Sequence, residues 1–344
     1  MNADDRPSGV SNSEPKAARR AVDSERFWQP SPWVVEHRGR ISFQVQPCPT
    51  LVEPAPIERA LATVEFAEEL GFDAVSFGDH PMMLDCWVWL AAAAIRTRRI
   101  RLGTGVACAA YRAPRATARL ATDLDHLSGG RLVLGLGSGW VPEEFEMLGV
   151  PFASGAERAG RLKETLAVVT ELWGPAATSV LGEHYTPRQL PRPPIMVAGG
   201  GLRTMRLVAQ YADACNIGPS RAAGGAGTPE QVAAKLAVLE RYCEEIGRPY
   251  EHLLRTYFVP SLVLARDEMG VRERREHYDG HPFIRPEHVR TPAEAIAEFQ
   301  SLADVGIEYF LVQLFDVGDH ETLRLLAEHV APHVRAKPSA RTAP

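Results

Sequence analysis

The sequence lacks a long apolar segment and has no large excess of charge of one sign. The apolar run that contains Val88–Ile95 is far shorter than the about 20 residues that span a bilayer. The N-terminus lacks the basic-then-apolar plan of a signal peptide. The net charge is −5, and the basic residues are scattered rather than banded. We therefore expect a cytoplasmic protein with no membrane partner and no nucleic-acid partner.

Cysteine is also scarce, and the motifs of several enzyme classes are missing. The five cysteines are odd in number and widely spaced, and no two form a C-x-x-C pair, which indicates a reduced protein without a disulfide framework. No H-x-H or H-E-x-x-H spacing supports a metal site, so a metal-dependent barrel hydrolase is disfavoured. No G-x-S-x-G motif supports a serine hydrolase. The cysteines are Cys48, Cys86, Cys108, Cys215 and Cys243.

The chain divides into one large domain and two short ends. Residues 1–38 are polar, rich in Ser, Pro and Ala, and without periodicity, so we expect a largely disordered extension. Phe27, Trp28 and Trp33 could dock part of it on the surface. Residues 335–344 are expected to form a flexible tail. Residues 39–334 remain for a single domain of the size of an eight-stranded barrel.

Strand and helix patterns alternate through this domain, which predicts parallel strands with right-handed crossovers. Eight such units are the number that closes a barrel, so the fold class is α/β, a (β/α)₈ TIM barrel with insertions after strands 4 and 7. The predicted strands are 41–46, 74–79, 100–105, 131–137, 195–198, 214–217, 257–264 and 309–315. The predicted helices are 57–70, 87–95, 114–127, 158–173, one ending at 211, 230–246, 292–305 and 321–330.

The insertion between strands seven and eight, residues 266–290, is charged and contains three histidines and a tyrosine. Loops that follow barrel strands lie on the face where such enzymes work. We therefore interpret residues 266–290 as a lid over the substrate.

The stretch Asp125–Trp140 contains a helix end, a tight turn, a strand and a glycine-rich strand end. Gly129 and Gly130 follow the helix where positive φ is needed. In the strand, Leu132, Leu134 and Leu136 share one face, which can pack on a helix layer. The other face carries Val133, Gly135, Gly137 and Gly139. Three glycines on one face predict the close approach of a flat group or of another backbone.

This stretch also resembles a known family. Leu127-Ser-Gly-Gly-Arg131 followed by Gly135-Leu-Gly-Ser-Gly-Trp140 resembles the luciferase-like monooxygenase superfamily, most closely its branch that depends on the deazaflavin F420. Similar pieces in the family's order are Asp79-His80, Leu102-Gly-Thr-Gly-Val106, Ala198-Gly-Gly-Gly201 and Tyr211-Ala-Asp-Ala-Cys-Asn216. They cover roughly residues 40–334.

His80 is the candidate catalytic residue. It ends a strand and so faces the barrel mouth, and its imidazole can exchange a proton near neutral pH beside a hydride transfer. Asp79 could orient His80 or contact the cofactor. Alternatively, Asp79 caps the next turn and His80 is a packed polar residue. The resemblance implies that Asp79 and His80 form a cofactor-contacting pair.

The resemblance places the cofactor ring on two neighbouring strand ends. It implies a cis peptide at Gly105-Val106, under the ring, where the alternative is an ordinary turn. It also implies contacts with Gly137, Ser138, Gly139 and Trp140. Trp140 is expected to stack near the cofactor or substrate, or else to pack in the core. The pattern Gly-x-Gly-x-Gly is not the G-x-G-x-x-G fingerprint of dinucleotide-binding folds.

A cofactor phosphate is expected after the fifth strand. Glycines at a strand end followed by a helix start expose N–H groups and the positive end of the helix dipole. A plain glycine turn is the alternative. The residues are Gly199, Gly200, Gly201, Leu202, Arg203 and Thr204. By contrast, Glu143, Glu144, Arg158 and Arg161 are interpreted as surface pairs on helices.

The expected function is therefore hydride transfer between F420 and a small organic substrate, as the resemblance implies. One alternative keeps the fold but uses reduced FMN and molecular oxygen as a monooxygenase. Another is a non-catalytic flavin-binding protein. The resemblance also implies a homodimer.

Overall fold

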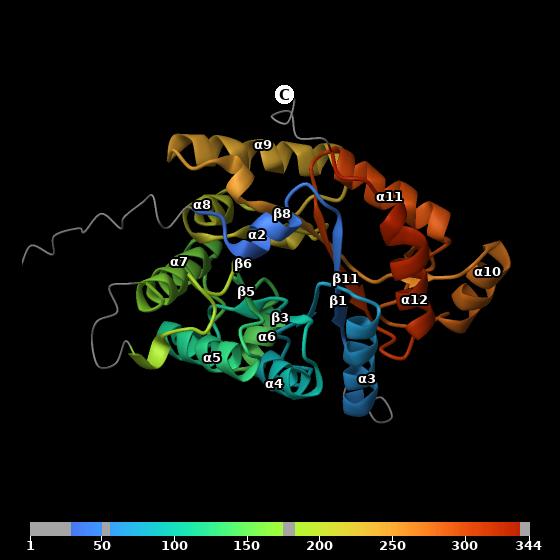
Figure 1. Ribbon diagram of the computed structural model, residues 1–344, viewed down its shortest axis with the longest axis horizontal. Coiled ribbons are helices and arrows are strands. Elements are labelled where there is room, and N and C mark those ends of the chain that lie inside the picture. The colour runs from blue at the N-terminus through green and yellow to red at the C-terminus, as the bar shows by residue number, and fades with distance from the viewer. Residues whose placement is uncertain (1–28, 50–55, 175–182, 338–344) are drawn as a thin grey trace, which may run out of the picture.

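A closed barrel of parallel strands forms the centre of the molecule (Figure 1). The computed structural model describes residues 29–49, 56–174 and 183–337. The strands run in the order β3-β2-β1-β11-β8-β7-β6-β5, and pairing between β3 and β5 closes the ring, which confirms the predicted TIM barrel. The strands are β1 Ser42–Pro47, β2 Ala74–Phe77, β3 Arg101–Thr104, β5 Leu132–Gly137, β6 Ile195–Ala198, β7 Ala214–Ile217, β8 Leu254–Val259 and β11 Tyr309–Leu314. The short β4, Ala107–Cys108, extends the third strand position along β5.

Helices surround the barrel in chain order, as Figure 1 shows. Several begin with the signals that such helices use: Pro at the first turn of α5, α9 and α11, and capping boxes at Ser154 and Thr291. The helices are α3 Pro56–Glu69, α4 Cys86–Arg96, α5 Pro114–Leu127, α7 Gly155–Leu172, α8 Leu202–Tyr211, α9 Pro229–Glu245, α11 Pro292–Asp304 and α12 His320–Leu325.

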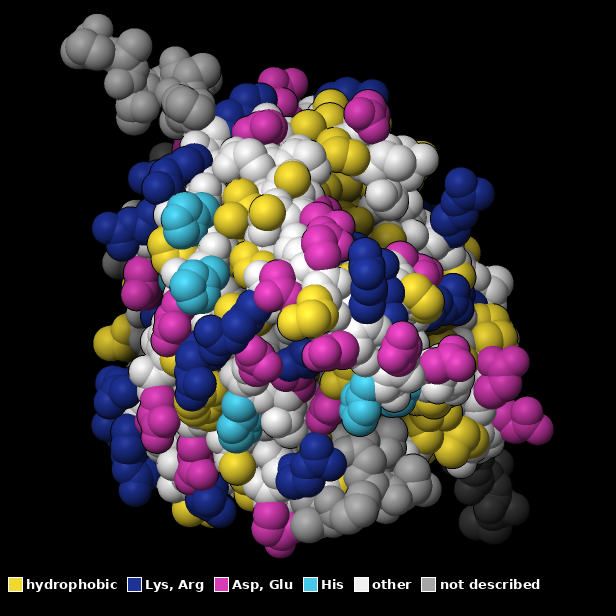
Figure 2. All heavy atoms as spheres, turned by 90° about the vertical axis from the view of Figure 1, so that its right-hand side faces the viewer, with side chains coloured by type: hydrophobic (Ala, Val, Ile, Leu, Met, Phe, Trp, Pro, Cys, Tyr) yellow, Lys and Arg dark blue, Asp and Glu magenta, His cyan; other side chains and the backbone are white. Residues whose placement is uncertain are grey.

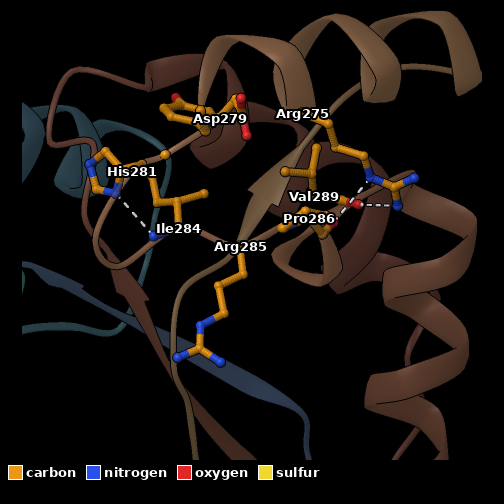
Figure 3. A pocket seen from close by; sticks show the side chains of 9 residues that line it. Arg275, Asp279, His281, Ile284, Arg285, Pro286 and Val289 are labelled. Carbon is orange, nitrogen blue, oxygen red and sulfur yellow. Dashed lines mark hydrogen bonds between the residues drawn. The ribbon is translucent and has the colours of Figure 1, made fainter.

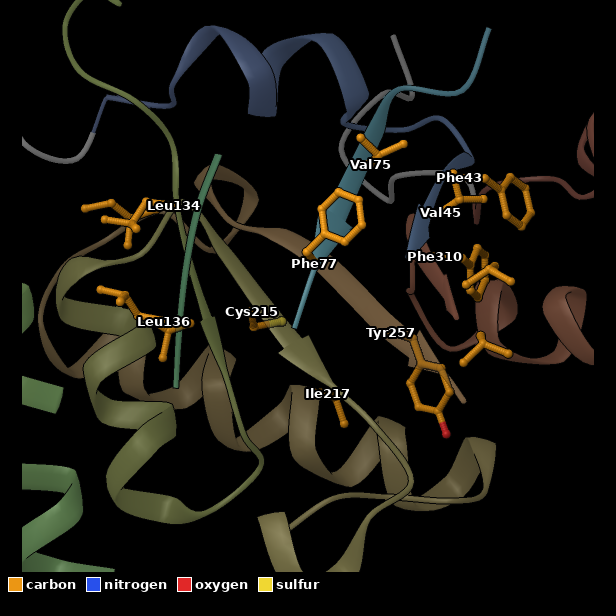
Figure 4. Close-up of a cluster of buried hydrophobic side chains, with 14 of the residues drawn as sticks. Phe43, Val45, Val75, Phe77, Leu134, Leu136, Cys215, Ile217, Tyr257 and Phe310 are labelled. Carbon is orange, nitrogen blue, oxygen red and sulfur yellow. The ribbon is translucent and has the colours of Figure 1, made fainter. Parts of the chain in front are cut away.

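The apolar core has two layers. Leu132, Leu134 and Leu136 are fully buried between the barrel and the helices, on the face predicted from their spacing. Figure 4 shows part of this layer, with side chains from β1, β2, β5, β7, β8 and β11. Val133, on the other face of β5, packs inside the barrel with Tyr309. Because side chains alternate along β5, the face that carries the glycines points into the barrel interior.

The boundaries at both ends of the domain differ from the prediction. Pro32–His37, expected in the disordered extension, forms helix α2. Its Trp33, which is 1% exposed, docks this helix on the barrel, as expected for that residue. Trp33 and Val34 pack on Tyr309 at the N-terminal end of the barrel because that end would otherwise expose apolar side chains. The backbone N–H of Arg335, expected in the tail, donates to Gln300 at 2.9 Å. Residues 1–28, with Phe27 and Trp28, and residues 338–344 lie outside the described residues.

The seventh strand also differs from the prediction. It was expected over 257–264, but β8 covers Leu254–Val259, and β9, Val263–Leu264, belongs to a separate two-stranded sheet with β10, Val289–Arg290. Pro260 lacks an N–H for the ladder and Ser261 has φ of 59°, so the strand cannot continue.

The insertion that follows β8 is folded rather than irregular. It contains α10, Glu268–His277, which Figure 1 places outside the ring of helices near α12. Arg274 pairs with Asp319 at 2.5 Å, and the hydroxyl of Tyr278 donates to Asp316 at 2.8 Å. These contacts attach the insertion to the loop after β11. Its role as a lid stays a prediction.

The surface carries charges of both signs. Figure 2 shows Lys, Arg, Asp and Glu side chains interspersed on the face that includes α10. Within the described ranges, no helix combines the length and the apolar character that crossing a membrane requires.

Candidate active site

The predicted site residues lie at the carboxyl ends of neighbouring strands. Asp79 and His80 follow β2, and Gly105-Val106 connects β3 to β4. Gly137 ends β5, with Ser138, Gly139 and Trp140 directly after it, and Gly199–Thr204 follows β6. Because β2, β3, β5 and β6 are consecutive around the barrel, these segments form one arc of its mouth.

His80 is held by a carboxylate that sequence reasoning assigned to the surface. Its Nδ1 lies 2.5 Å from Oε1 of Glu144, and the His80 side chain is 31% exposed. Glu144 is buried on the short helix α6, Pro142–Met147, together with Phe145. The interpretation of Glu144 as a surface pair is therefore wrong, because α6 turns this side chain toward the barrel mouth. Its exposed neighbour Glu143 fits the surface interpretation.

The second carboxylate oxygen of Glu144, Oε2, also accepts a hydrogen bond. The hydroxyl of Tyr111 donates to Oε2 at 3.2 Å. Burial, together with the nearby Cys108 and Glu144, raises the pKa of Tyr111, so its hydroxyl keeps the proton it donates. A carboxylate can only accept hydrogen bonds, so we assign the proton to Nδ1 of His80. Nε2 is then the nitrogen that can accept a proton.

Asp79 does not orient His80. Its Oδ2 accepts from Nη1 of Arg112 at 2.6 Å and from the backbone N–H of Cys108 at 3.0 Å, and its Oδ1 accepts from Nη2 of Arg112 at 3.0 Å. Burial lowers the pKa of Arg112, but the hydrogen bonds and charge of Asp79 outweigh burial and raise it. Asp79 therefore anchors the loop after β4. A contact with the cofactor stays a prediction.

One group of described residues has metal-ligand spacing. Possible ligand atoms of Asp79, Asp85 and Cys86 lie within 4.8 Å of one another. The guanidinium of Arg112 pairs with both carboxylates, and burial raises the pKa of the Cys86 thiol well above its usual range. A protonated thiol and a fixed positive charge oppose the binding of a cation.

The peptide between Gly105 and Val106 is cis, as the resemblance implied. A Cβ on Gly105 would lie 2.5 Å from Oγ of Ser76 and 2.7 Å from Oε1 of Gln46, so only glycine fits here. The side chain of Val106 lies over the bare face of β5, 2.8 Å from where a Cβ of Gly137 would be.

Gly135 shows why that face of β5 is bare. A Cβ on Gly135 would overlap the carbonyl oxygen of Thr104, and the Thr104 hydroxyl donates to the Gly135 carbonyl at 2.6 Å. The predicted close approach is therefore made by the backbone of β3. The approach of a flat group to this region stays a prediction.

The chain turns sharply between β5 and α6. Gly139 has φ of +71°, and a Cβ there would lie 2.7 Å from the ring of Phe145. The side chain of Trp140 is 46% exposed, so Trp140 is not a core residue. Arg158, expected in a surface pair, instead donates from Nε to the Gly139 carbonyl at 3.2 Å, which secures this turn. Arg161 does form a surface pair, with Glu164 at 2.7 Å.

The predicted phosphate residues fall into two groups. The N–H groups of Gly199 and Gly200 donate to the carbonyls of Asn216 and Ala223, and a Cβ on Gly200 would overlap the Gly224 backbone. These two glycines therefore serve the packing of neighbouring loops. In contrast, α8 begins at Leu202 with no side chain capping it, so no cap side chain bonds its first N–H groups. Nζ of Lys235 lies beside them, 2.7 Å from the Gly200 carbonyl.

A cavity of about 150 Å³ lies in the insertion after β8 (Figure 3). Its lining includes Tyr278 and His281, and Arg275 donates there to the carbonyls of Pro286 and Val289 at 3.1 Å. Figure 3 shows the side chain of Arg285 pointing away from His281. No strand end that carries a predicted site residue lines this cavity, so we do not assign the active site to it.

Comparison with known proteins identifies the family. The model of luciferase-like monooxygenases matches residues 38–309 of this chain. Monooxygenase RslO1 from Streptomyces bottropensis has a similar structure, with a TM-score of 0.67 and 25% sequence identity over 85% of this chain and 99% of that one.

Two similar relatives are named F420-dependent glucose-6-phosphate dehydrogenase. The protein of Beutenbergia cavernae is 34% identical over 182 residues, which are 47% of this chain and 53% of the relative. The protein of Intrasporangium calvum is 27% identical over 289 residues, which are 72% of this chain and 85% of the relative. This chain thus spans about half the length of the first relative and most of the second.

Proposed function

Because this chain belongs to the luciferase-like monooxygenase family, we propose that it is an F420-dependent oxidoreductase that transfers a hydride between the deazaflavin and a small organic substrate. The two dehydrogenases named for F420 support the choice of cofactor. The single observation that carries the proposal is the contact of His80 with Glu144, which leaves Nε2 as the proton acceptor at the same end of the barrel as the cis peptide at Gly105-Val106.

The residues present fit such a cofactor. The uncapped first turn of α8, with Gly201, Leu202, Arg203 and Thr204, would hold a phosphate, and Lys235 adds positive charge beside it. Gly105, Val106 and the segment Gly137–Trp140 would lie against the ring system, and Asp79 secures the loop after β4. When bound, the deazaflavin would supply a centre that accepts or donates a hydride.

The protein's own part in the reaction is proton exchange and orientation. For a substrate such as an alcohol, Nε2 of His80 would accept the hydroxyl proton, and in the reverse direction the protonated imidazole would return it to the carbonyl oxygen. Glu144 holds the imidazole in one orientation and stabilises the positive charge that it then carries. Tyr111 fixes Glu144 in turn.

The first test is equilibrium binding of oxidised F420 and of FMN to the purified protein, by fluorescence titration side by side. Tight binding of F420 with weak binding of FMN is expected. The reverse preference would favour the second candidate function, an oxygen-using monooxygenase with reduced FMN, which the likeness to monooxygenase RslO1 supports. Failure of both to bind would contradict the site assignment.

Substitution of His80 tests catalysis directly. His80→Ala is expected to lower kcat by about 10²- to 10⁴-fold, because the substrate proton loses its acceptor, while the affinity for F420 changes little. Steady-state kinetics and cofactor titration measure the two effects. Full activity of the variant would instead show that His80 has no catalytic role. Cofactor binding without turnover in the unaltered protein would favour a non-catalytic flavin-binding member of the family.

A homodimer, which the resemblance implied, belongs to the same proposal. Sedimentation equilibrium of the purified protein over a range of concentrations measures it directly, and a monomer at every concentration would contradict it.

A further inference from the structure

We infer that Gln46 binds the substrate directly, and that the reacting group of the substrate is an oxygen atom, as in an alcohol and its aldehyde or ketone. The amide of Gln46 donates a hydrogen bond to that oxygen while Nε2 of His80 exchanges its proton. This inference rests on the proposed function and adds a second protein group and a substrate class to the same site. It comes from a buried side-chain amide that has an N–H group without an acceptor among the described residues.

Gln46 lies near the carboxyl end of β1, which neighbours β2 in the barrel. Phe43 and Val45 of this strand pack in the layer beneath the helices, as Figure 4 shows. Because side chains alternate along a strand, Gln46 points into the barrel interior. Its side chain is almost completely buried, with 1% of the residue exposed. Buried amides normally have partners for all their polar atoms, so an unpaired N–H group there requires an explanation.

The oxygen of this amide is held by neighbouring side chains. Nε2 of Gln44 donates to Oγ of Ser76 at 2.6 Å, so Ser76 directs its own proton to Oε1 of Gln46 at 3.3 Å. Oε1 also lies 2.7 Å from where a Cβ of Gly105 would be, next to the cis peptide. These contacts fix which side of the amide carries the oxygen, and we assign Nε2 to the other side.

The nitrogen of the amide has spare hydrogen-bonding capacity. Nε2 carries two N–H groups. The amide contacts the thiol of Cys48, a weak acceptor that already accepts from Nε2 of Gln313 at 3.0 Å. Among the described residues, the hydrogen bond from Ser76 to Oε1 is the only one that joins the Gln46 amide to an oxygen or nitrogen atom. At least one N–H group of Gln46 therefore lacks an acceptor in the protein.

This N–H group lies close to the imidazole of His80. A Cβ on Gly78 would be 3.4 Å from Nε2 of Gln46 and 3.3 Å from Nε2 of His80, so the two nitrogens are near neighbours. The same Cβ would lie 2.8 Å from Cδ2 of His80, so glycine at this position leaves room for the ring. A substrate oxygen bound here would accept from Gln46 and share its proton with His80.

The two nitrogens suit an oxygen that changes its charge during the reaction. When the O–H bond of an alcohol breaks, the proton moves to Nε2 of His80 and the electron pair stays on the oxygen, which becomes more negative. A fixed N–H donor aimed at that oxygen stabilises the developing charge, as the donors of an oxyanion hole do. In the reverse direction, the N–H group of Gln46 polarises the carbonyl that receives the proton.

The substrate class is tested first. The purified protein is titrated with F420 and then assayed anaerobically with oxidised F420 and ethanol, cyclohexanol or benzyl alcohol. The corresponding aldehyde or ketone is assayed with reduced F420. Turnover of at least one alcohol and carbonyl pair is expected. A protein that binds F420 but turns over none of them would overturn the inference, whereas absence of F420 binding would contradict the proposed function itself.

Gln46→Met tests the residue, because it keeps the length of the side chain and removes both N–H groups. We expect kcat/KM for the best alcohol of the screen to fall by about 10²- to 10³-fold, with little change in the affinity for F420. Gln210→Met, which replaces an exposed residue near the end of α8, is the matched control and should keep the original rate.

A second variant covers the case in which Gln46→Met does not fold. Gln46→Glu keeps the shape of the side chain and the oxygen that accepts from Ser76, but it has no N–H group, so near neutral pH it should lose rate to a similar extent. Unchanged kcat/KM in both variants would overturn the inference. Weaker binding of F420 with unchanged turnover at saturating cofactor would also overturn it, because Gln46 would then contact the cofactor instead of the substrate.

Discussion

At the scale of single residues, the decisive contact joins His80 to Glu144, which are 64 positions apart. Glu144 reaches neither cofactor nor substrate in this scheme, so it is a positioning residue. It fixes which nitrogen of His80 can exchange a proton, and Tyr111 fixes Glu144 through its second oxygen. The site is thus a chain of three side chains from the loops after β2, β4 and β5.

Glu144→Gln tests this positioning role. The amide keeps the size of the side chain but loses the charge, so kcat/KM should fall by about 10- to 100-fold while the protein stays folded. The pH profile of kcat/KM should also change, which a merely structural role would not produce. Glu143→Gln, on the same helix but exposed, should leave rate and profile unaltered. Identical kinetics in both variants would exclude the proposed role.

At the scale of elements, the bare face of β5 is explained by the neighbouring strand. β3 pairs with the first part of β5, and Thr104 then bonds to Gly135 with both the donor and the acceptor of its hydroxyl, at 2.6 and 2.9 Å. The glycines therefore allow β3 to come close where the cis peptide begins. Part of the glycine pattern serves the barrel rather than the cofactor.

Gly135→Ala should destabilise the fold by about 1–3 kcal/mol or more, because its Cβ would overlap the Thr104 carbonyl. Gly160→Ala is the matched control within α7, where nothing lies within 4 Å of the new Cβ. There alanine should stabilise by roughly 0.5–1 kcal/mol. Urea unfolding curves of the two variants measure the difference, and similar curves would contradict this account of β5.

The helix α2 is a second element with a structural role. Trp33 donates from Nε1 to Asp73 at 3.1 Å and packs on Tyr309 with ring centroids 5.4 Å apart. Asp73 also pairs with His37 at 2.9 Å. Helix α2 thus closes the N-terminal end of the barrel, opposite the active site.

Trp33→Ala should lower the free energy of unfolding by about 3–5 kcal/mol, because a fully buried indole is lost. Val35→Ala removes a side chain that is 54% exposed on the same helix, so it should have little effect. Thermal melts followed by circular dichroism compare them. Equal melting temperatures would show that α2 does not stabilise the barrel.

At the scale of the whole molecule, all five cysteines are free and buried. Burial raises the pKa of Cys48 to about 12 and that of Cys108, Cys215 and Cys243 to about 11, and it raises the pKa of Cys86 well above its usual range. An exposed thiol in the unfolded chain has a pKa of about 8.5. The folded state therefore holds its thiols protonated at pH values where the unfolded state ionises them.

This difference predicts a loss of stability in alkali. Below about pH 8.5 both states bind the thiol protons, so the contribution is fully present. As the pH rises toward 11, the unfolded chain loses protons that the folded chain keeps, and unfolding becomes more favourable. Melting temperatures measured between pH 8 and pH 11 should fall progressively. In the folded protein, the buried thiols should react slowly with a disulfide reagent. A constant melting temperature over this range would contradict the prediction.

The sequence by itself determined the barrel, its strand order and the face of β5 that packs outward, because alternation of apolar side chains is a local property of each strand and helix. Because strand ends converge on one face of such a barrel, the sequence also predicted His80 and the start of α8 as site residues. The family resemblance implied the cis peptide at Gly105-Val106. Only the tertiary structure decided that Glu144 orients His80, that Arg112 donates hydrogen bonds to the Asp79 carboxylate, and that α2 closes the N-terminal end of the barrel. Those contacts join residues far apart in the chain. They depend on the path that each connecting loop takes over the closed barrel, which no local sequence pattern specifies.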